Sequence, residues 1–446
     1  SHRQHQRYPR VLFKENFMKN SLKLVISVLF FLSVSFAQTY VPDDNFEQAL
    51  IDLGYDDTLD DFVLTENISG VTQLNIGEKE ISDLTGIGGF TALTNLACYL
   101  NQLTNLDLSA NTVLGYLDIS DNNLTALDVS NNSALETLKC SHNLLTTLNL
   151  GANTALNGLS CDNNNLTTLD VISNTLLTDL ECNDNQLTSL NLSTNTALID
   201  LRCQTNQLTS LDVSSNTALT YLNCNDNQLT SLNVSSNTAL TNLSISDNEL
   251  TSLDVSANTD LQAISLNYNQ LTSLDVSSNT ALTSLSCQSN QLTSLDVSNN
   301  TELTTLQCLQ NEITTLDVSN NTALTIFYCK QNELTYLNMK NGVTDALTSF
   351  KATDNSLTCI EVNADDVAYA TANWTSGNSN IDAGVTFSES CAVQGNPDYT
   401  YVPDNNFEQA LIDLGYDDTL DDFVLTASIS GVTNLNISGG GIINMT

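Results

Sequence analysis

The chain repeats one pattern of apolar and polar positions every 21 residues. The unit reads L-x-x-L-x-C-x-x-N-x-L-T-x-L-D-V-S-x-N-T-A, and its positions are numbered here from the first leucine. That leucine recurs as Leu93, Leu114, Leu135, Leu156, Leu177, Leu198, Leu219, Leu240, Leu261, Leu282, Leu303 and Leu324, and a degenerate unit follows at Leu347. Self-similarity at so short and constant a period is typical of solenoid proteins.

Each unit contains two short stretches in which apolar residues alternate with polar ones. One is Leu-x-Cys, as at Leu96 and Cys98, and the other is Leu-Asp-Val, as at Leu127 and Val129. Alternation of this kind is typical of half-buried strands. One coil cannot bury its apolar residues alone, so stacked coils must share a continuous core. The pattern predicts a mainly β solenoid, a right-handed coil with two parallel sheets and weak curvature.

Position 9 is an asparagine throughout. The row comprises Asn101, Asn122, Asn143, Asn164, Asn185, Asn206, Asn227, Asn248, Asn269, Asn290, Asn311, Asn332 and Asn355. A stacked amide offers donors and an acceptor to turn backbone groups that would otherwise be unpaired. We therefore predict a structural role for this row.

The repeat resembles the leucine-rich-repeat superfamily over residues 71–358. It is most similar to the short 21-residue type of bacterial secreted surface proteins and more distantly related to the internalins. The first unit, Val71-Thr72-Gln73-Leu74-Asn75-Ile76, is the most internalin-like. The resemblance implies a binding scaffold, with residues 71–356 as the solenoid, and it implies no particular ligand.

The N-terminal segment has the features of a leader. The first methionine is Met18, followed by Lys19, Lys23 and an apolar run that ends before Ala37. This order is typical of a secretory signal peptide cleaved after Ala37. Residues 1–37 are therefore interpreted as leader plus signal peptide, which predicts a secreted or cell-surface protein.

Residues 38–70 are predicted to cap the start of the solenoid. Asp44 and Glu47 match a capping box, Phe46 and Leu50 share a helical face with Leu53, and Gly54 can end the helix. A cap is required because the first coil otherwise exposes the apolar core.

Residues 357–391 are predicted to form the C-terminal cap, followed by a linker at 392–399. Cys359 and Cys391 bracket this region, which carries the only tryptophan, Trp374. They are the only cysteines outside the repeat positions, and in an exported protein we expect them to form a disulfide.

The sequence at the start of the predicted mature chain occurs a second time after the linker. Residues 400–437 repeat 39–76 with four differences, at positions 405, 427, 428 and 434. We expect 400–446 to be the truncated start of a second cap and repeat domain, because a cap alone has no core to cover.

The composition narrows the classes of function. The formal net charge is −39, and removing 1–37 leaves six basic residues against 50 acidic ones. Nucleic acid and anionic membranes both need a basic surface, so neither is an expected partner. The mature chain keeps one histidine, His142, which excludes histidine-based triads and multi-histidine metal sites.

Nine cysteines occupy position 6: Cys98, Cys140, Cys161, Cys182, Cys203, Cys224, Cys287, Cys308 and Cys329. Ile119, Ile245 and Leu266 stand at the same position, which indicates an apolar slot that cysteine fills as a small hydrophobic residue. Zinc binding would require closely spaced cysteine pairs, so core packing is the favoured interpretation.

Position 15 is mostly aspartate on the predicted convex side. Four consecutive coils carry Asp254, Asp275, Asp296 and Asp317, which should stand about 5 Å apart and repel one another. Hydrogen bonds from nearby Ser, Thr or backbone groups can stabilise them. The alternative is that calcium ions bridge the aspartates along the row. A second candidate calcium site consists of the cap residues Asp56, Asp57, Asp60 and Asp61. No other cofactor is predicted.

The predicted concave face exposes positions 3, 5 and 7, which are mostly Ser, Thr, Asn or Asp. The candidate contact residues that depart from this pattern are Tyr116, Arg202, Tyr221, Leu309, Ile326, Tyr328 and Lys330. Tyrosine offers contact area and a hydroxyl at low entropic cost. Lys139 and Arg202 have acidic residues one coil earlier, Asp118 and Glu181, so cross-strand pairing is the alternative for both. For Leu309, Ile326, Tyr328 and Lys330 the alternative to ligand contact is a structural role, because these residues lie where the repeats change into the C-terminal cap.

These observations predict a monomeric extracellular module that binds protein or polysaccharide through its concave face, for adhesion or capture. The alternative is a structural surface-coat or spacer protein, which calcium bridging would stiffen. No unique cleft or perturbed catalytic group is evident, so an enzyme is not predicted.

Overall fold

The computed structural model describes residues 37–391 and, further along, 399–402, 405–417, 423–430, 432 and 435. Residues 1–36 of the predicted leader and signal peptide and residues 392–398 of the predicted linker lie outside these ranges. No helix in the described ranges combines the length and apolarity needed to span a bilayer.

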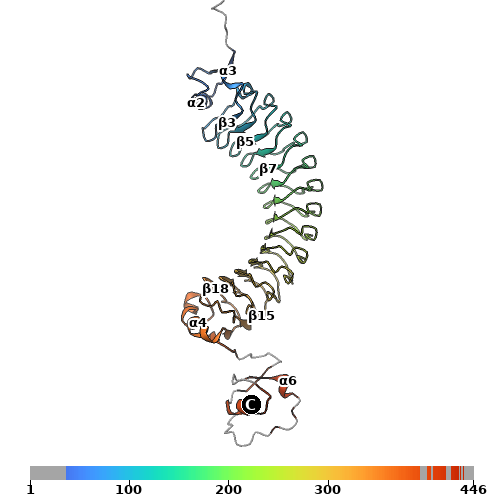
Figure 1. The fold of residues 1–446 in the computed structure, drawn as a ribbon, viewed down its shortest axis with the longest axis vertical. Coiled ribbons are helices and arrows are strands. Elements are labelled where there is room, and N and C mark those ends of the chain that lie inside the picture. The colour runs from blue at the N-terminus through green and yellow to red at the C-terminus, as the bar shows by residue number, and fades with distance from the viewer. Residues whose placement is uncertain are drawn as a thin grey trace, which may run out of the picture.

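The described repeats coil into a solenoid with one long parallel sheet (Figure 1). Its 14 strands are β3 (Gln73–Asn75), β4 (Asn95–Ala97), β5 (Tyr116–Asp118), β6 (Thr137–Lys139), β7 (Gly158–Ser160), β8 (Asp179–Glu181), β9 (Asp200–Arg202), β10 (Tyr221–Asn223), β11 (Asn242–Ser244), β12 (Ala263–Ser265), β13 (Ser284–Ser286), β14 (Thr305–Gln307), β16 (Ile326–Tyr328) and β18 (Ser349–Lys351). Each repeat strand pairs in register with the next, so equal repeat positions stack. The leucine-rich-repeat solenoid predicted from the sequence is confirmed.

The second predicted sheet is much shorter than the pattern indicates. It comprises β15 (Thr315–Asp317), β17 (Tyr336–Asn338), β19 (Cys359–Glu361) and β20 (Thr386–Ser388), all parallel. Earlier coils contribute one isolated bridge, between Asn149 and Asp170. The alternation of Leu-Asp-Val therefore marks a buried, extended segment in most coils without predicting whether neighbouring segments pair.

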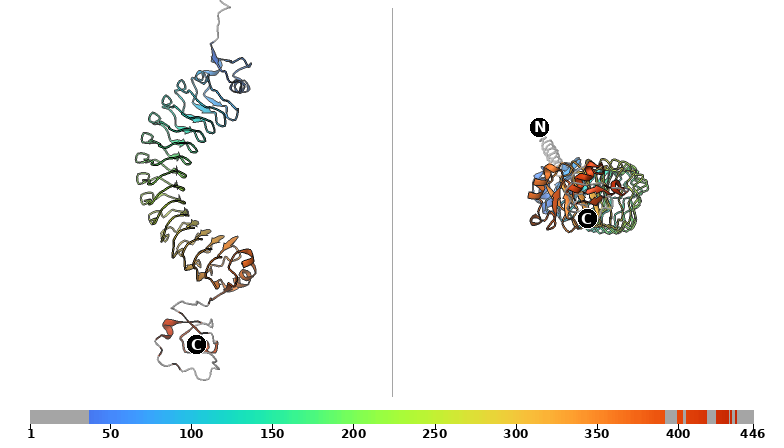
Figure 2. Two further views of the ribbon diagram at one scale, coloured as in Figure 1. Left: turned by 180° about the vertical axis from the view of Figure 1, so that it is seen from behind. Right: turned by 90° about the horizontal axis from the view of Figure 1, so that it is seen from below.

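The solenoid bows more strongly than expected (Figures 1 and 2). The long sheet lines the inside of the arc, where strand pairing fixes the coil spacing at about 4.8 Å. Most of the outer side has no ladder to hold adjacent coils at that spacing, so the coils separate there. Weak curvature would have required two complete sheets.

Two ladders of asparagine amides join the coils inside the core. At position 9, Asn122 donates from Nδ2 to the carbonyl oxygens of Cys98 and Ile119 and accepts the Leu103 N–H at Oδ1. The same bonds recur along the row, which confirms its structural role. At position 19, fully buried amides such as Asn132 donate to the carbonyls of Leu108 and Asn111 in the preceding coil.

The N-terminal cap pairs β1 (Gln38–Tyr40) antiparallel with β2 (Phe62–Leu64) and holds the helices α2 (Asp44–Asp52) and α3 (Thr65–Ile68). The capping-box pattern predicted Asp44 as the N-cap of α2, but the N-cap residue is Asp43. Oδ1 of Asp43 accepts the N–H groups of Asn45 and Phe46, while Oδ2 accepts Ser82 and Asp83 of the first coil. The sequence pattern missed this because the contact to the first coil, 39 residues away, favours Asp43.

Two further predictions for this helix were wrong. Glu47 does not close a capping box, because its Oε1 accepts the N–H groups of Asp60, in the loop before β2, and of Phe62, the first residue of β2. Leu53 is 48% exposed and lies past the end of the helix, so of the three predicted residues Phe46 and Leu50 alone belong to the buried face, which they share with Ala49. Gly54 follows with a positive φ of 81°, as expected for a helix end.

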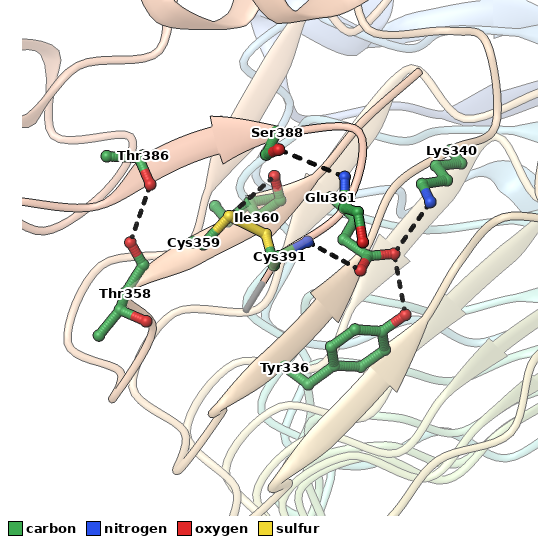
Figure 3. Close-up of a disulfide and its surroundings, with 10 residues drawn as sticks. Tyr336, Lys340, Thr358, Cys359, Ile360, Glu361, Thr386, Ser388 and Cys391 are labelled. Atoms are coloured by element: carbon green, nitrogen blue, oxygen red, sulfur yellow. Dashed lines mark hydrogen bonds and ion pairs between the residues drawn. A yellow bond between two sulfur atoms is a disulfide. The ribbon is translucent and has the colours of Figure 1, made fainter. Parts of the chain in front are cut away.

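The C-terminal end of the core is covered by α4 (Val367–Asn373), flanked by the 3₁₀ turns η2 (Ala364–Asp366) and η3 (Ser376–Asn378). Trp374 is buried there, its ring centroid 4.5 Å from that of Phe350 and 5.8 Å from that of Phe387. The structure contains a disulfide between Cys359 in β19 and Cys391 after β20 (Figure 3).

Beyond residue 398, the described elements repeat the order of the first cap. They are β21 (Tyr399–Tyr401), α5 (Asn405–Asp413), β22 (Phe423–Leu425) and α6 (Thr426–Ile429). Val402, Leu411 and Val424 form a small core, matching Val41, Leu50 and Val63 of the first cap.

Candidate binding surface

The inner face of the arc presents two side chains from each strand. Positions 3 and 5 flank a buried residue at position 4 and are partly exposed, as in β9, β10 and β16. Side chains alternate across a strand, so both point away from the core. The candidates Tyr116, Arg202, Tyr221, Ile326 and Tyr328 all lie on this face.

Arg202 and Tyr221 form a packed pair on adjacent strands. The guanidinium carbon of Arg202 lies 4.8 Å from the centroid of the Tyr221 ring, a cation–π arrangement. Nε and Nη2 of Arg202 donate to the two oxygens of Asp200 at 3.1 and 3.0 Å, and Glu181 lies 3.7 Å from Nε. The bonds to Asp200 are the main cause that raises the pKa of Arg202.

The predicted pairing of Arg202 with Glu181 is therefore present, but Asp200 is the closer partner. The sequence could have indicated this contact, because Asp200 and Arg202 are two residues apart in one strand and their side chains therefore lie on the same face. Lys139 lies opposite Asp118 in the register, and the structure shows no ion pair of 4 Å or less for Lys139 within the described ranges.

Tyr116 lies towards the N-terminal end of the face. Its hydroxyl donates to Asp118 at 3.4 Å, and burial together with the charge of Asp118 raises its pKa. One coil earlier the ring of Tyr99 lies against Gly77, where any Cβ would come within 2.7 Å of it. Gly77 therefore provides the space that this tyrosine occupies.

Four of the predicted contact residues, Leu309, Ile326, Tyr328 and Lys330, belong to the C-terminal end of the concave face, and the structure exposes only some of them. Ile326 and Tyr328 share the exposed face of β16, and the Tyr328 hydroxyl lies 2.9 Å from that of Ser349. Lys330 follows two residues later. Leu309 is buried, with a relative exposure of 9%, so its side chain is not available to contact a ligand. Position 7 is partly enclosed between coils, since Ser141 and Ser246 at this position are buried as well.

The row of convex aspartates is held by local hydrogen bonds. Oδ1 of Asp254, Asp275, Asp296 and Asp317 accepts the N–H of the serine two residues later at 2.8–2.9 Å. Bonds to that serine, first from its hydroxyl, lower the pKa of Asp254, Asp275 and Asp296. In the described ranges no three His, Cys, Asp or Glu side chains are grouped to hold a metal ion. Calcium binding by this row stays a prediction.

The nine position-6 cysteines are free and fully buried. Burial raises the pKa of each thiol, to about 12 for Cys203 and Cys287. A thiol that does not ionise is a poor nucleophile and a poor metal ligand. The row therefore packs as an apolar stripe, which agrees with the presence of isoleucine or leucine at position 6 in other coils.

Comparison with known proteins identifies the class. No protein-family model matches the sequence. Over 73 residues the chain is 37% identical to internalin J of Listeria monocytogenes serotype 4b (strain F2365), a stretch that spans 16% of this chain and 8% of that protein. The structure of the functional domain of InlJ from Listeria monocytogenes, described as including a cysteine ladder, has a TM-score of 0.62 at 33% identity and covers 76% of this chain and 80% of its own.

A second solved structure, the internalin InlF of the same species, has a TM-score of 0.64 at 22% identity and covers 71% of this chain and 98% of its own. The repeat, the sheet and these similarities define a bacterial leucine-rich-repeat solenoid. Within that class, the chain belongs to the internalin-like leucine-rich-repeat proteins.

Proposed function

We propose that this chain is a secreted or cell-surface interaction module for adhesion or capture, and that it binds protein or polysaccharide through its concave face. The observation that supports this most directly is the Arg202–Tyr221 pair. Arginine and tyrosine are enriched among residues that dominate binding energy at interfaces. Asp200 and Glu181 fix the guanidinium before any ligand arrives, so little side-chain entropy remains to be lost on binding.

The extracellular location rests on the predicted signal peptide and on the likeness to internalins. The acidic composition favours solubility and disfavours nucleic acid and anionic membranes as partners. The proposal involves no chemical step and requires no cofactor.

The test is a screen of the mature chain on protein and polysaccharide arrays, once with calcium and once with a chelator. We expect a defined ligand whose affinity falls when Tyr221→Ala or Tyr328→Ala is introduced. Asp212→Asn, on a convex turn, is the matched control and should leave binding unchanged. Absence of any ligand in both buffers would contradict the proposal.

A spacer function is the alternative, and one observation favours it. From β11 to β14 every exposed sheet position is Ser, Thr, Asn, Gln or Ala, a surface with no residue that stands out. A chain that binds nothing and melts at lower temperature in chelator would favour this alternative, with calcium stiffening the coils.

A further inference from the structure

Two exposed aliphatic residues break the repeat beside the Arg202–Tyr221 pair. Leu176 and Ile199 are 56% and 44% exposed and lie three and one residues before the strands β8 and β9. Leu176 stands at position 21, where alanine is usual, and Ile199 at position 2, where threonine is usual.

Folding does not account for either residue. Threonine at position 2 donates its hydroxyl to the carbonyl of the preceding coil, as Thr178 does to Asn157 and Thr241 to Thr220. Ile199 forgoes that bond and exposes apolar surface to water instead, which is unfavourable unless something covers it.

The charges around these residues have one sign. Asp179 begins β8, whereas Asp184 and Asp226 lie three residues after the ends of β8 and β10, at the other end of the parallel strands from Leu176 and Ile199. None of these three carboxylates forms an ion pair with a described residue. The guanidinium of Arg202 is already neutralised by Asp200 and Glu181. An occupant of this surface therefore meets apolar side chains within a negative field.

We propose that Leu176, Ile199, Asp179, Asp184 and Asp226 form an extended flank site, which runs along the strands from the apolar pair to Asp184 and Asp226. It binds a basic protein segment in which an apolar side chain is set between Lys or Arg residues. This inference rests on the proposed binding function and specifies the partner. The aliphatic side chains offer no hydrogen bonds to sugar hydroxyls, whereas they match an apolar anchor of a protein ligand. Charge complementarity supplies the orientation and speeds association.

The test measures binding of fluorescent 15-residue peptides to the full chain by anisotropy. The peptides carry Lys and Arg around a central Leu or Phe, and an equally charged poly-lysine peptide is the reference probe. We expect the apolar-centred peptides to bind more tightly than poly-lysine, and added salt to weaken both.

The variant Leu176→Ala/Ile199→Thr restores the repeat consensus and so keeps the fold. It should weaken the apolar-centred peptides about tenfold and leave poly-lysine unchanged. Asp179→Asn/Asp184→Asn should weaken all basic peptides. Val113→Ala, an exposed position-21 side chain three coils away, is the matched control and should change nothing.

Equal binding by the consensus variant, equal binding of poly-lysine, or no binding of any peptide would each overturn the flank site. The broader function fails separately. It stands if the arrays give a ligand that depends on Tyr221 or Tyr328, and it falls only if they give none.

Discussion

At the scale of single residues, position 8 of every regular coil carries an unusual backbone. From Leu100 to Gln331 these residues have φ between 50° and 56°, the left-handed region that only glycine, asparagine and aspartate adopt readily. Several are Asp or Asn, such as Asp184 and Asn163, but Thr205 is β-branched and Tyr268 is bulky. The solenoid imposes this conformation because position 8 turns the chain out of each strand.

An exchange between two coils tests this account. Thr205→Asn should raise the stability by about 1 kcal/mol, because the left-handed conformation costs a β-branched residue more than asparagine. The reverse change, Asn163→Thr, should lower stability by a similar amount. Thermal unfolding followed by circular dichroism measures both, and two shifts of the same sign would refute the explanation.

Asp43 links the cap helix to the first coil through a buried carboxylate. Burial opposes its ionisation, but the bonds from Ser82, Phe46 and Asp83 outweigh burial and lower its pKa below the ordinary value of 3.8. Its stabilising contribution is therefore complete above pH 3.8 and is lost as the pH falls through its lowered folded value.

Replacing this carboxylate should reveal that pH dependence. Asp43→Asn places an amide where the carboxylate accepts five hydrogen bonds and should cost about 1–3 kcal/mol at neutral pH. Between neutral pH and pH 3, the midpoint of thermal unfolding should fall less for the variant than for the parent. Asp52→Asn, at an exposed helix position, is the control, and equal slopes for Asp43→Asn and the parent would contradict the assignment.

At the scale of elements, in-register stacking converts each repeat position into a row with one role. Positions 1, 4, 6, 11 and 16 contribute to the core, positions 9 and 19 form the two amide ladders, and positions 3 and 5 form the inner surface. The sequence was sufficient to predict these rows because a fixed period places equivalent residues side by side.

The position-6 row gives a chemical prediction. Because burial raises the pKa of the thiols, to about 12 for Cys203, the folded chain should not react with iodoacetamide at pH 8. Mass spectrometry should count nine modified cysteines after unfolding in denaturant without reductant. Rapid modification of the native chain would show that this row opens to solvent.

The convex aspartates give a prediction about metal. Their serine partners already supply hydrogen bonds, so Asp275→Asn should lower the melting temperature equally in calcium and in chelator. A calcium-dependent rise in the melting temperature of the parent, abolished by this change, would instead establish bridging along the row.

At the scale of the whole molecule, the sequence predicted the solenoid but not its curvature. Curvature depends on whether the outer segments of adjacent coils pair as strands. The Leu-Asp-Val sequence is the same in coils whose outer segments pair and in coils whose outer segments do not. For the binding surface, the sequence identified the tyrosines and Arg202 as departures from the repeat. It missed the burial of Leu309 and the bidentate contact to Asp200, which depend on side-chain packing between coils.

The central claim is that the inner face of the arc and its flank bind a partner while the outer turns do not. The most direct measurement is hydrogen–deuterium exchange of the chain with and without the ligand that the arrays select. The account predicts slower exchange in the segments around β8 to β10 or around β16, and unchanged exchange at the turns that carry Asp254 to Asp317. Protection confined to those outer turns would contradict it.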